Sequence, residues 1–294
     1  MLTVPDALVP VILRAMRANR TFVTADGARR RIRERQLRPQ PFGPPPRLSR
    51  TVRIEVAHDP WPVYTLTPRS IEPAGGVVYV HGGGWVNQIV GLQWRFAAQL
   101  AVEARTTVSV PIYPLVPFGT AADAVDGVAR LVRSSIARFG RTALVGDSAG
   151  GQIALSTALA LRDEGIALPR TVLISPALDL TWSNPRIPIV QPTDPWLATP
   201  GGVVLAEAWR GGLSLRDPAV SPLFADLRGL GPISLYTGTR DVLNPDAHLL
   251  ATRAQEAGVD LEILEAPGQV HVYPILPTRT GDRARHRIAA SLRV

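Results

Sequence analysis

Short apolar and β-branched runs alternate with longer segments of helical periodicity from about residue 51 onward. The runs expected to form strands are Thr51–Val56, Val63–Thr67, Gly76–Val80, Thr106–Ile112, Thr142–Val145, Thr171–Ser175, Ile233–Thr237 and Leu261–Glu265. The expected helices are Leu92–Ala104, Ala121–Phe139, Ala149–Asp163, Asp246–Ala257 and a last one near Arg283–Leu292. Strands separated by helices indicate βαβ units and a mostly parallel sheet.

Several expected strands, such as VVYV and TVLIS, are continuous apolar runs. Such runs are typical of strands whose two sheet faces are both covered. The first two strands have no helix between them, so we expect an antiparallel N-terminal edge. The pattern therefore predicts an α/β fold, with a mostly parallel eight-stranded sheet flanked by helices.

The alternation is interrupted between the strands Thr171–Ser175 and Ile233–Thr237. This stretch contains PRIPIVQPTDPW and a helical piece, Val203–Arg210, but no good strand. A long insertion at one edge of a sheet is typical of a cover over a binding site, and a packing excursion without function is the alternative. We expect a catalytic domain at 51–294, with a cap insertion at about 178–230.

The N-terminal fifty residues have a different character. The chain of 294 residues has a net charge of +8, but residues 1–53 hold twelve Arg and three acidic residues, and the rest is close to neutral. We expect a short amphipathic helix at 11–20 and an extended Pro-rich stretch, Pro39–Arg47. Residues 1–50 are thus expected to form a basic, Pro-rich arm that is part of a helical cap.

The sequence shows neither a secretory signal nor an apolar run long enough to span a membrane, which favours a cytoplasmic protein. No nucleic-acid-binding motif accompanies the basic arm, so we expect no nucleic-acid partner. Weak attachment of residues 11–38 to an anionic membrane surface is one interpretation. The favoured alternative is a solvated cap whose Arg side chains face water. Formation of a homodimer stays open.

Two residue types are missing, and their absence narrows the chemistry. There is no Cys, and all 32 basic residues are Arg. The first absence excludes disulfides, thiolate metal sites and a cysteine nucleophile. The second excludes a pyridoxal Schiff base, a P-loop lysine and a Ser–Lys hydrolase. We expect neither a cofactor nor a metal.

The strongest motif is GDSAG at residues 146–150, between an expected strand and an expected helix. It matches the G-x-S-x-G nucleophile elbow, whose glycines give room for a sharp turn. Ser148 would then lie at a helix N-terminus, which favours developing negative charge. A glycine-rich turn capped by serine is the alternative. Ser148 is the candidate nucleophile.

A second motif, HGGGW at residues 81–85, directly follows the strand that ends at Val80. Three glycines let the backbone approach a ligand and aim its N–H groups at an oxygen atom. Alone, the motif fits a flexible turn, but together with the elbow it indicates an oxyanion-hole loop. Trp85 is a candidate wall of the substrate pocket, with a packed loop aromatic as the alternative.

A serine nucleophile needs a base, and the base needs an orienting acid. His271 follows the strand Leu261–Glu265 and is the candidate base, because the other four histidines have structural interpretations. Asp241 follows the strand Ile233–Thr237 and is the candidate acid, whereas the runner-up Asp246 resembles a helix N-cap. Open α/β sheets place their sites at these strand ends, and the order Ser, Asp, His is that of α/β-hydrolases.

Taken together, HGGGW, GDSAGG, SPLFADLRGLGPISLYTGTRDVLNPDA and PGQVHVY resemble the hormone-sensitive-lipase-like branch of the α/β-hydrolase esterases and lipases. The resemblance runs from about Val77 to His271. It implies a serine esterase that acts on short- to medium-chain acyl esters without a metal and binds the acyl group under an N-terminal cap. The oxyanion-hole donors that it implies are the N–H groups of Gly82, Gly83 and Ala149.

Two stretches depart from this branch. Relatives often carry Tyr-Arg-Leu-Ala-Pro-Glu where this chain has Tyr113–Phe118, without the Arg and Glu. After HGGGW the chain continues with residues 86–88, Val-Asn-Gln, instead of a small residue. Some members of the branch are receptors that have lost a triad residue. Because this chain keeps all three candidates, an enzyme is expected ahead of a non-catalytic small-molecule-binding protein.

Overall fold

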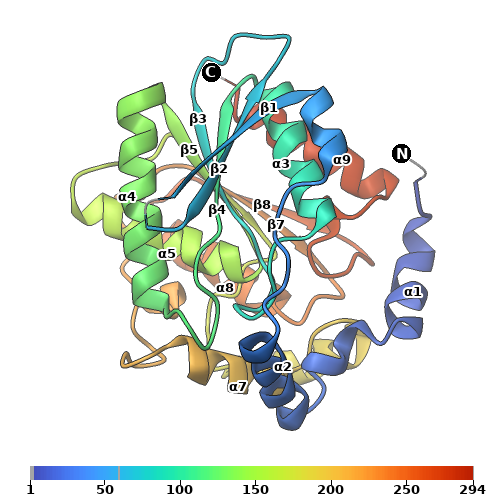
Figure 1. Cartoon of the computed structure of the whole chain (residues 1–294). Coiled ribbons are helices and arrows are strands. Elements are labelled where there is room, and N and C mark those ends of the chain that lie inside the picture. Colours follow the sequence, from blue (N-terminus) through green and yellow to red (C-terminus); the bar gives the residue numbers. More distant parts are fainter. Residues whose placement is uncertain (1–2, 59, 294) are drawn as a thin grey trace.

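One sheet organises the computed structural model, which describes residues 3–58 and 60–293 (Figure 1). Its order is β1-β2-β4-β3-β5-β6-β7-β8. The strands are β1 (Val52–His58), β2 (Pro62–Pro68), β3 (Gly76–Val80), β4 (Thr107–Pro111), β5 (Thr142–Asp147), β6 (Thr171–Ile174), β7 (Ile233–Gly238) and β8 (Leu261–Ala266). β2 is antiparallel to both of its neighbours, and every other pairing is parallel. The predicted α/β fold and antiparallel edge are confirmed.

Helices cover both faces of the sheet, which explains the continuous apolar runs. The helices are α1 (Val9–Ala15), α2 (Ala25–Leu37), α3 (Gly91–Ala104), α4 (Ala121–Phe139), α5 (Ala149–Asp163), α6 (Ile187–Val190), α7 (Thr199–Trp209), α8 (Asn244–Glu256) and α9 (Arg279–Ser291). In β3, Val77 and Tyr79 pack towards α3 and α9, whereas Val78 and Val80 pack towards α4, α5 and α8. Side chains alternate between faces along a strand, so a strand covered twice is apolar at every position.

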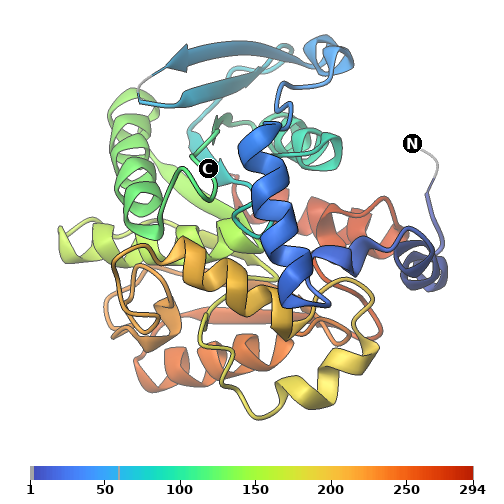
Figure 2. The same ribbon diagram turned by 60° about the horizontal axis from the view of Figure 1, so that its bottom comes forward.

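The N-terminal segment and the insertion lie side by side, although they are far apart in the sequence (Figures 1 and 2). Helix α2 packs against α7, and the Gly201 N–H donates to the Phe22 carbonyl at 2.8 Å. A Cβ at Gly201 would lie 2.4 Å from the Thr21 carbonyl oxygen, so only glycine permits this approach. The two segments together cover the carboxyl ends of the parallel strands.

Three expected helix starts were placed too late, for one physical reason. The helices expected at 11–20, Val203–Arg210 and Asp246–Ala257 begin at Val9, Thr199 and Asn244. Each carries Pro in its first turn, where the missing N–H would have no helical partner. The first of them also ends early, at Ala15, because Arg17 adopts a left-handed conformation with φ of 49°.

Two other boundaries differ from the sequence analysis. The Pro-rich stretch was expected to be extended through Arg47, but Pro46–Arg50 forms a 3₁₀ helix. Helix α9 begins at Arg279 and not near Arg283, because the Thr278 hydroxyl accepts a hydrogen bond from the Gly281 N–H at 3.0 Å and caps the helix.

Within residues 3–58 and 60–293, no helix has the length and apolar character needed to cross a membrane. The same residues contain no group of three or more His, Asp or Glu side chains arranged to hold a metal ion.

Candidate active site

The turn between β5 and α5 holds Ser148 in a strained conformation. Its φ is 55° and its ψ is −120°, a region that L-residues rarely occupy. A Cβ at Gly146 would lie 2.2 Å from the Gly150 carbonyl oxygen, and one at Gly150 would lie 2.1 Å from the Val80 carbonyl oxygen. The two glycines therefore allow the backbone to fold tightly and present Ser148 at the edge of the sheet.

The structure brings Ser148, His271 and Asp241 into one line of hydrogen bonds. The Ser148 Oγ lies 2.9 Å from the His271 Nε2, and the His271 Nδ1 lies 2.8 Å from the Asp241 Oδ2. His271 is 4% exposed and Asp241 is fully buried. Nδ1–H donates to the carboxylate, so Nε2 is left to accept the serine proton. These are the geometric relations that a nucleophile, a base and an orienting acid require.

Charges around His271 favour its protonated form. Burial works to lower the pKa of the imidazole, but the negative charge and hydrogen bond of Asp241, together with the charges of Asp194 and Asp147, outweigh it. The net pKa of His271 therefore lies above its usual value of 6.5. An imidazolium formed when the serine loses its proton is stabilised by the same carboxylates.

Asp194 is a second buried carboxylate at the site, and the sequence analysis missed it. Its Oδ1 accepts the N–H groups of Trp196 and Leu197 at 2.7 and 3.0 Å, and its Oδ2 accepts the Val242 N–H at 2.8 Å. Burial and the charge of Asp241 raise the pKa of Asp194 to about 6. Asp194 thus fastens the insertion to the residue that follows the acid. The available signal was its position in the PTDPW stretch of the insertion.

The glycine loop corrects one expectation about the oxyanion hole. The Gly82 N–H already donates to the Asp147 Oδ1 at 3.0 Å, so it is not free for a ligand. The N–H groups of Gly83, Gly84 and Ala149 have no acceptor within the described chain, and Gly83 and Gly84 line the cavity beside Ser148. The expected donor Gly82 is therefore occupied, because the buried carboxylate next to Ser148 takes up the first N–H of the loop, and Gly84 becomes a candidate donor in its place.

Asp147 supports that loop from within the core. Besides Gly82, it accepts the Tyr79 hydroxyl at 2.6 Å and the Gln93 amide at 3.0 Å. Burial raises the pKa of this carboxyl, and the three hydrogen bonds oppose the rise. A buried carboxylate with this many donors fixes the relative positions of β3, β5 and α3.

Trp85 does not line the cavity. It is 3% exposed, it stacks on Trp209 with ring centroids 6.0 Å apart, and its indole N–H donates to the Gln152 Oε1 at 3.1 Å. The Trp209 indole donates to the same Oε1 at 2.9 Å. The expected pocket-wall role is therefore wrong, and the packed loop aromatic is what the structure shows. Gln152 was missed: one buried amide joins the glycine loop, α5 and α7.

The residues that depart from the family pattern contact the N-terminal segment. The Arg35 guanidinium donates to the Asn87 Oδ1 at 3.1 Å, and the Gln88 N–H donates to the Gln40 Oε1 at 3.2 Å. Tyr113 stacks on the buried His81 and donates its hydroxyl to the His81 carbonyl at 2.8 Å. The altered stretches therefore still support the glycine loop, partly through the arm.

A cavity of about 300 Å³ opens at Ser148 and His271. Its wall combines the glycine loop with apolar side chains from the arm, the insertion and the C-terminal loop. These apolar residues, none of them singled out in the sequence, are Phe22, Val90, Leu92, Trp196, Leu197, Val272, Ile275 and Leu276. Trp196 also meets the His271 ring edge-on, with centroids 5.8 Å apart. An apolar cavity with a few convergent polar groups is the usual form of a small-molecule site.

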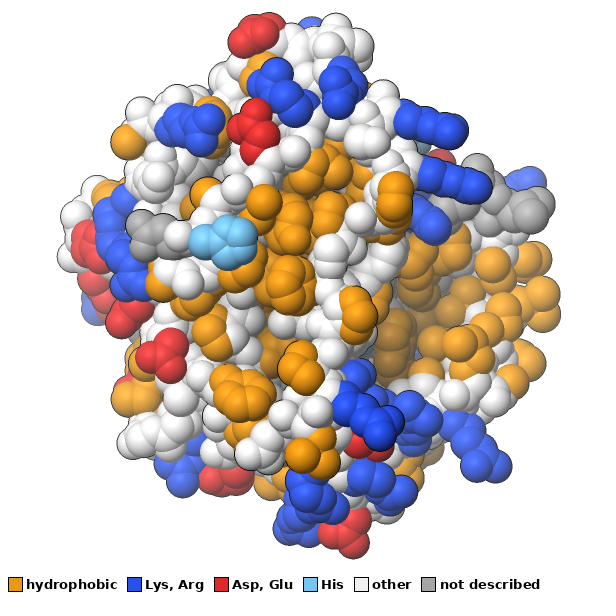
Figure 3. Space-filling view, viewed as in Figure 1, with side chains coloured by type: hydrophobic (Ala, Val, Ile, Leu, Met, Phe, Trp, Pro, Cys, Tyr) orange, Lys and Arg blue, Asp and Glu red, His pale blue; other side chains and the backbone are white. Residues whose placement is uncertain are grey.

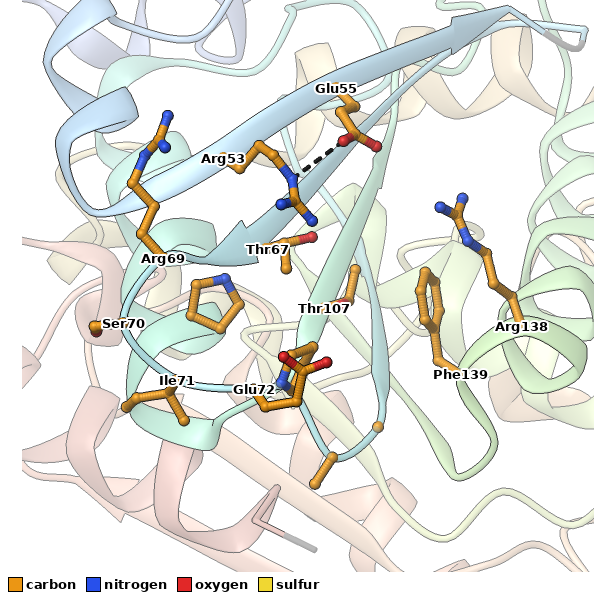
Figure 4. Close-up of a pocket in the computed structure, with 14 residues that line it drawn as sticks. Arg53, Glu55, Thr67, Arg69, Ser70, Ile71, Glu72, Thr107, Arg138 and Phe139 are labelled. Atoms are coloured by element: carbon orange, nitrogen blue, oxygen red, sulfur yellow. Dashed lines mark ion pairs between the residues drawn. The ribbon is translucent and has the colours of Figure 1, made fainter.

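A larger hollow, of about 810 Å³, lies at the other end of the sheet, by the first residues of β3 and β4 (Figure 4). Its wall carries charges of both signs, and Figure 4 shows the ion pair between Arg53 and Glu55, with Nε and Oε1 3.1 Å apart. It contains none of the expected site residues, so size alone does not identify the site in this protein.

Two of the other histidines and the second aspartate that were considered for the base and the acid have contacts of their own. His248 and His286 are exposed and lie 2.6 and 2.8 Å from the carboxylates of Glu265 and Glu103. Asp246 is not a helix N-cap: α8 begins at Asn244 with Leu243 before it, and the Asp246 side chain is buried inside the first turn.

A serine, a histidine and an aspartate in hydrogen-bond contact at the carboxyl edge of such a sheet define the α/β-hydrolase class. The family model described as the alpha/beta hydrolase fold matches residues 77–275. The chain belongs to this family, in its esterase and lipase branch with hormone-sensitive-lipase-like structural neighbours.

Several relatives carry related names. A triacylglycerol lipase of Mycobacterium tuberculosis is 34% identical over 79% of this chain, which spans only 50% of that lipase. An acetyl-hydrolase of Streptomyces hygroscopicus is 32% identical over 74% of this chain and 75% of its own length. The crystal structure of an esterase from the bacterial hormone-sensitive lipase family has a TM-score of 0.81 and 27% identity, and it covers 100% of this chain and 99% of that one.

Proposed function

We propose that the protein is a serine carboxylic-ester hydrolase of the hormone-sensitive-lipase-like branch. The observation that carries the proposal is the line of hydrogen bonds from Ser148 through His271 to Asp241, with separations of 2.9 and 2.8 Å. Family membership and the names of the relatives support the same activity.

In the proposed reaction, His271 Nε2 accepts the Ser148 proton while Oγ forms a bond to the ester carbonyl carbon. The carbonyl oxygen becomes an oxyanion that the N–H groups of Gly83, Gly84 and Ala149 bind. Asp241 stabilises the imidazolium. When the intermediate collapses, the bond to the alcohol breaks and the alcohol leaves with the proton from His271. Water then repeats the sequence and releases the acid.

We also propose that the substrate carries a short- to medium-chain acyl group. The cavity of about 300 Å³ has the size of a small-molecule pocket, and apolar side chains dominate its wall. Phe22 from the arm and Trp196 from the insertion stand on this wall. Residues 1–50 and the insertion at about 178–230 would together serve as the cap of a catalytic domain that spans 51–294.

Hydrolysis of p-nitrophenyl esters tests the activity. The protein should release p-nitrophenol from the acetate and butyrate esters, and Ser148→Ala should abolish release while Ser134→Ala, an exposed serine of α4, should not. Activity that persists in Ser148→Ala would overturn the assignment. A chain-length series from acetate to palmitate tests the pocket separately: a maximum at palmitate would contradict the acyl-length proposal and leave the esterase proposal standing.

A further inference from the structure

The outer side of α1 is apolar and exposed to solvent. Val11 is 58% exposed and Met16 is 73% exposed, and Leu8 and Ile12 are exposed beside them. Figure 3 shows hydrophobic side chains gathered over the segment that Figure 1 labels α1, at the right of the molecule. An isolated exposed apolar residue is ordinary, but a cluster on one short helix indicates an interaction surface.

Exposed arginines lie next to this apolar surface. Figure 3 shows basic side chains gathered immediately below α1, over α2. The exposed arginines of this segment that have no ion pair within the described chain are Arg14, Arg17, Arg20, Arg30, Arg33 and Arg38. Their charges are therefore not neutralised by the protein itself. We call the exposed apolar side of α1, together with these arginines, the arm surface.

The inner side of α1 connects the arm surface to the catalytic cavity. Val9 and Leu13 pack in one cluster with Leu92, Trp196 and Leu276, all three of which line the cavity. Helix α1 therefore packs behind part of the cavity wall, and a partner bound to its outer side would lie close to that wall.

We propose that the arm surface docks the protein on an anionic lipid bilayer. The apolar side chains of α1 would enter the headgroup region, and the unpaired arginines would contact lipid phosphates, as in interfacial amphipathic helices. Charge complementarity selects this partner over a second copy of the chain, since two arm surfaces face to face would bring two strongly positive segments together. Nucleic acid would use the arginines but leave the apolar side chains in water.

The arm surface thereby presents the cavity to esters at a lipid surface. This inference concerns where the protein acts and goes beyond the proposed hydrolysis, and its test does not require the enzyme to be active. Attraction to an anionic bilayer amounts to about fivefold in the partition constant for each arginine near the surface. Replacement of three exposed apolar side chains by polar ones should weaken partitioning more than tenfold.

Cosedimentation with vesicles tests the proposal on the full chain. The protein should bind vesicles of phosphatidylcholine with one third phosphatidylglycerol at low salt, and should bind pure phosphatidylcholine at least tenfold more weakly. The triple variant Val11→Gln, Ile12→Gln, Met16→Gln removes the apolar side. The double variant Arg30→Gln, Arg33→Gln removes charge and should reduce both binding and its salt dependence.

Two matched variants outside the arm surface serve as controls. Leu249→Gln on α8 and Arg130→Gln on α4 replace exposed residues of the same kinds, and both should bind the anionic vesicles like the unaltered protein. Hydrolysis of p-nitrophenyl acetate in solution should be unchanged in all four variants, which separates lipid binding from catalysis.

Three outcomes would overturn the proposal. They are no binding to the anionic vesicles at low salt, equal binding by the arm variants and the controls, and a stable dimer in sedimentation velocity that the triple variant converts to a monomer without any lipid binding. The last outcome would assign the arm surface to a second copy of the chain.

Discussion

The N–H of Gly82 donates to the Oδ1 of Asp147 over 3.0 Å, and this bond ties the glycine loop after β3 to the last residue of β5. Asp147 immediately precedes Ser148, so the nucleophile and the proposed oxyanion donors are positioned by one carboxylate. The electrostatic contribution of such donors depends on their being fixed before the reaction begins.

Loss of this acceptor should therefore reduce the rate. In Asp147→Ala, the Gly82 N–H has no acceptor, and kcat should fall on the order of 10²-fold with little change in KM. Asp147→Asn keeps an oxygen that can accept from Gly82, so its kcat should stay within about tenfold of the unaltered enzyme. Steady-state kinetics with p-nitrophenyl butyrate, on protein checked for folding by circular dichroism, measures both. Equal rates in the two variants would contradict the positioning role.

The conformation of Gly83 gives a second prediction. Its φ is 136°, and an added Cβ would lie 2.3 Å from the Asn87 carbonyl oxygen. Gly83→Ala must therefore distort the loop, and kcat should fall on the order of 10²–10³-fold, as when one oxyanion donor is removed. Gly212→Ala is the control, because a Cβ there meets nothing within 4 Å and the backbone has no positive φ. A fully active Gly83→Ala would exclude this loop from the oxyanion hole.

The raised pKa of His271 predicts the acid side of the pH profile. The base must be neutral, so kcat/KM should rise with pH through a pKa above 6.5. Asp194→Asn removes a nearby negative charge, which should lower the pKa of His271 and move this limb to lower pH. Asp194→Ala also frees the N–H groups of Trp196 and Leu197, so KM should rise as well. If the rise of kcat/KM occurred at the same pH in Asp194→Asn, Asp194 would have only a structural role.

Asp246 predicts a pH dependence of stability. Burial and the charge of Asp179 raise its pKa to about 7, and its Oδ2 has no partner in the described chain. The folded state then binds more protons than the unfolded state between pH 4 and 7, so stability should decrease as pH rises through this range.

Asp246→Asn should remove this dependence, and between pH 4 and 8 the variant should gain about 4 kcal/mol of unfolding free energy relative to the unaltered protein. Urea unfolding at several pH values measures the gain. Asp260 is exposed, and Asp260→Asn makes the same charge change. This variant should show the same pH dependence of unfolding free energy as the unaltered protein. Parallel pH dependences for Asp246→Asn and the unaltered protein would show that the buried carboxyl does not titrate in this range.

The strands of the sheet were predictable because the apolar runs in the sequence coincide with the segments that the fold buries. All eight strands lie where the sequence pattern indicated them, and β3 to β7 are buried at every position, as continuous apolar runs require. The candidates Ser148, Asp241 and His271 also follow strand ends. Once the strands are known, all three are therefore expected at the same edge of the sheet. The helix starts at Val9, Thr199 and Asn244 were placed too late in the sequence analysis, because a proline in the first turn looks like a break in the helical pattern.

The cavity wall and its supports were not predictable from local pattern. Trp196 and Phe22 reach the cavity only because the insertion and the arm fold back over the sheet. The Gly82 N–H is bound by a carboxylate 65 positions away in the sequence. The spacing of the glycines alone therefore cannot show that this N–H is occupied while those of Gly83 and Gly84 are free of a partner in the described chain. Asp194 and Gln152 likewise act through contacts between segments that are distant in the sequence.

The Gln152 side chain accepts two hydrogen bonds, and it holds the glycine loop and α7 more firmly than α1 is held. The glycine loop and α7 are bound to α5 through two indoles on one buried amide, so a change on that side disturbs the reaction centre. Helix α1 packs on its neighbours through apolar contacts, and two hydrogen bonds flank it, from the Val4 N–H to the Pro277 carbonyl and from the Thr280 hydroxyl to the Asp6 carboxylate. Helix α1 is therefore the part of this enzyme that can vary most independently: a different first helix could direct the protein to another surface while the chemistry stays the same.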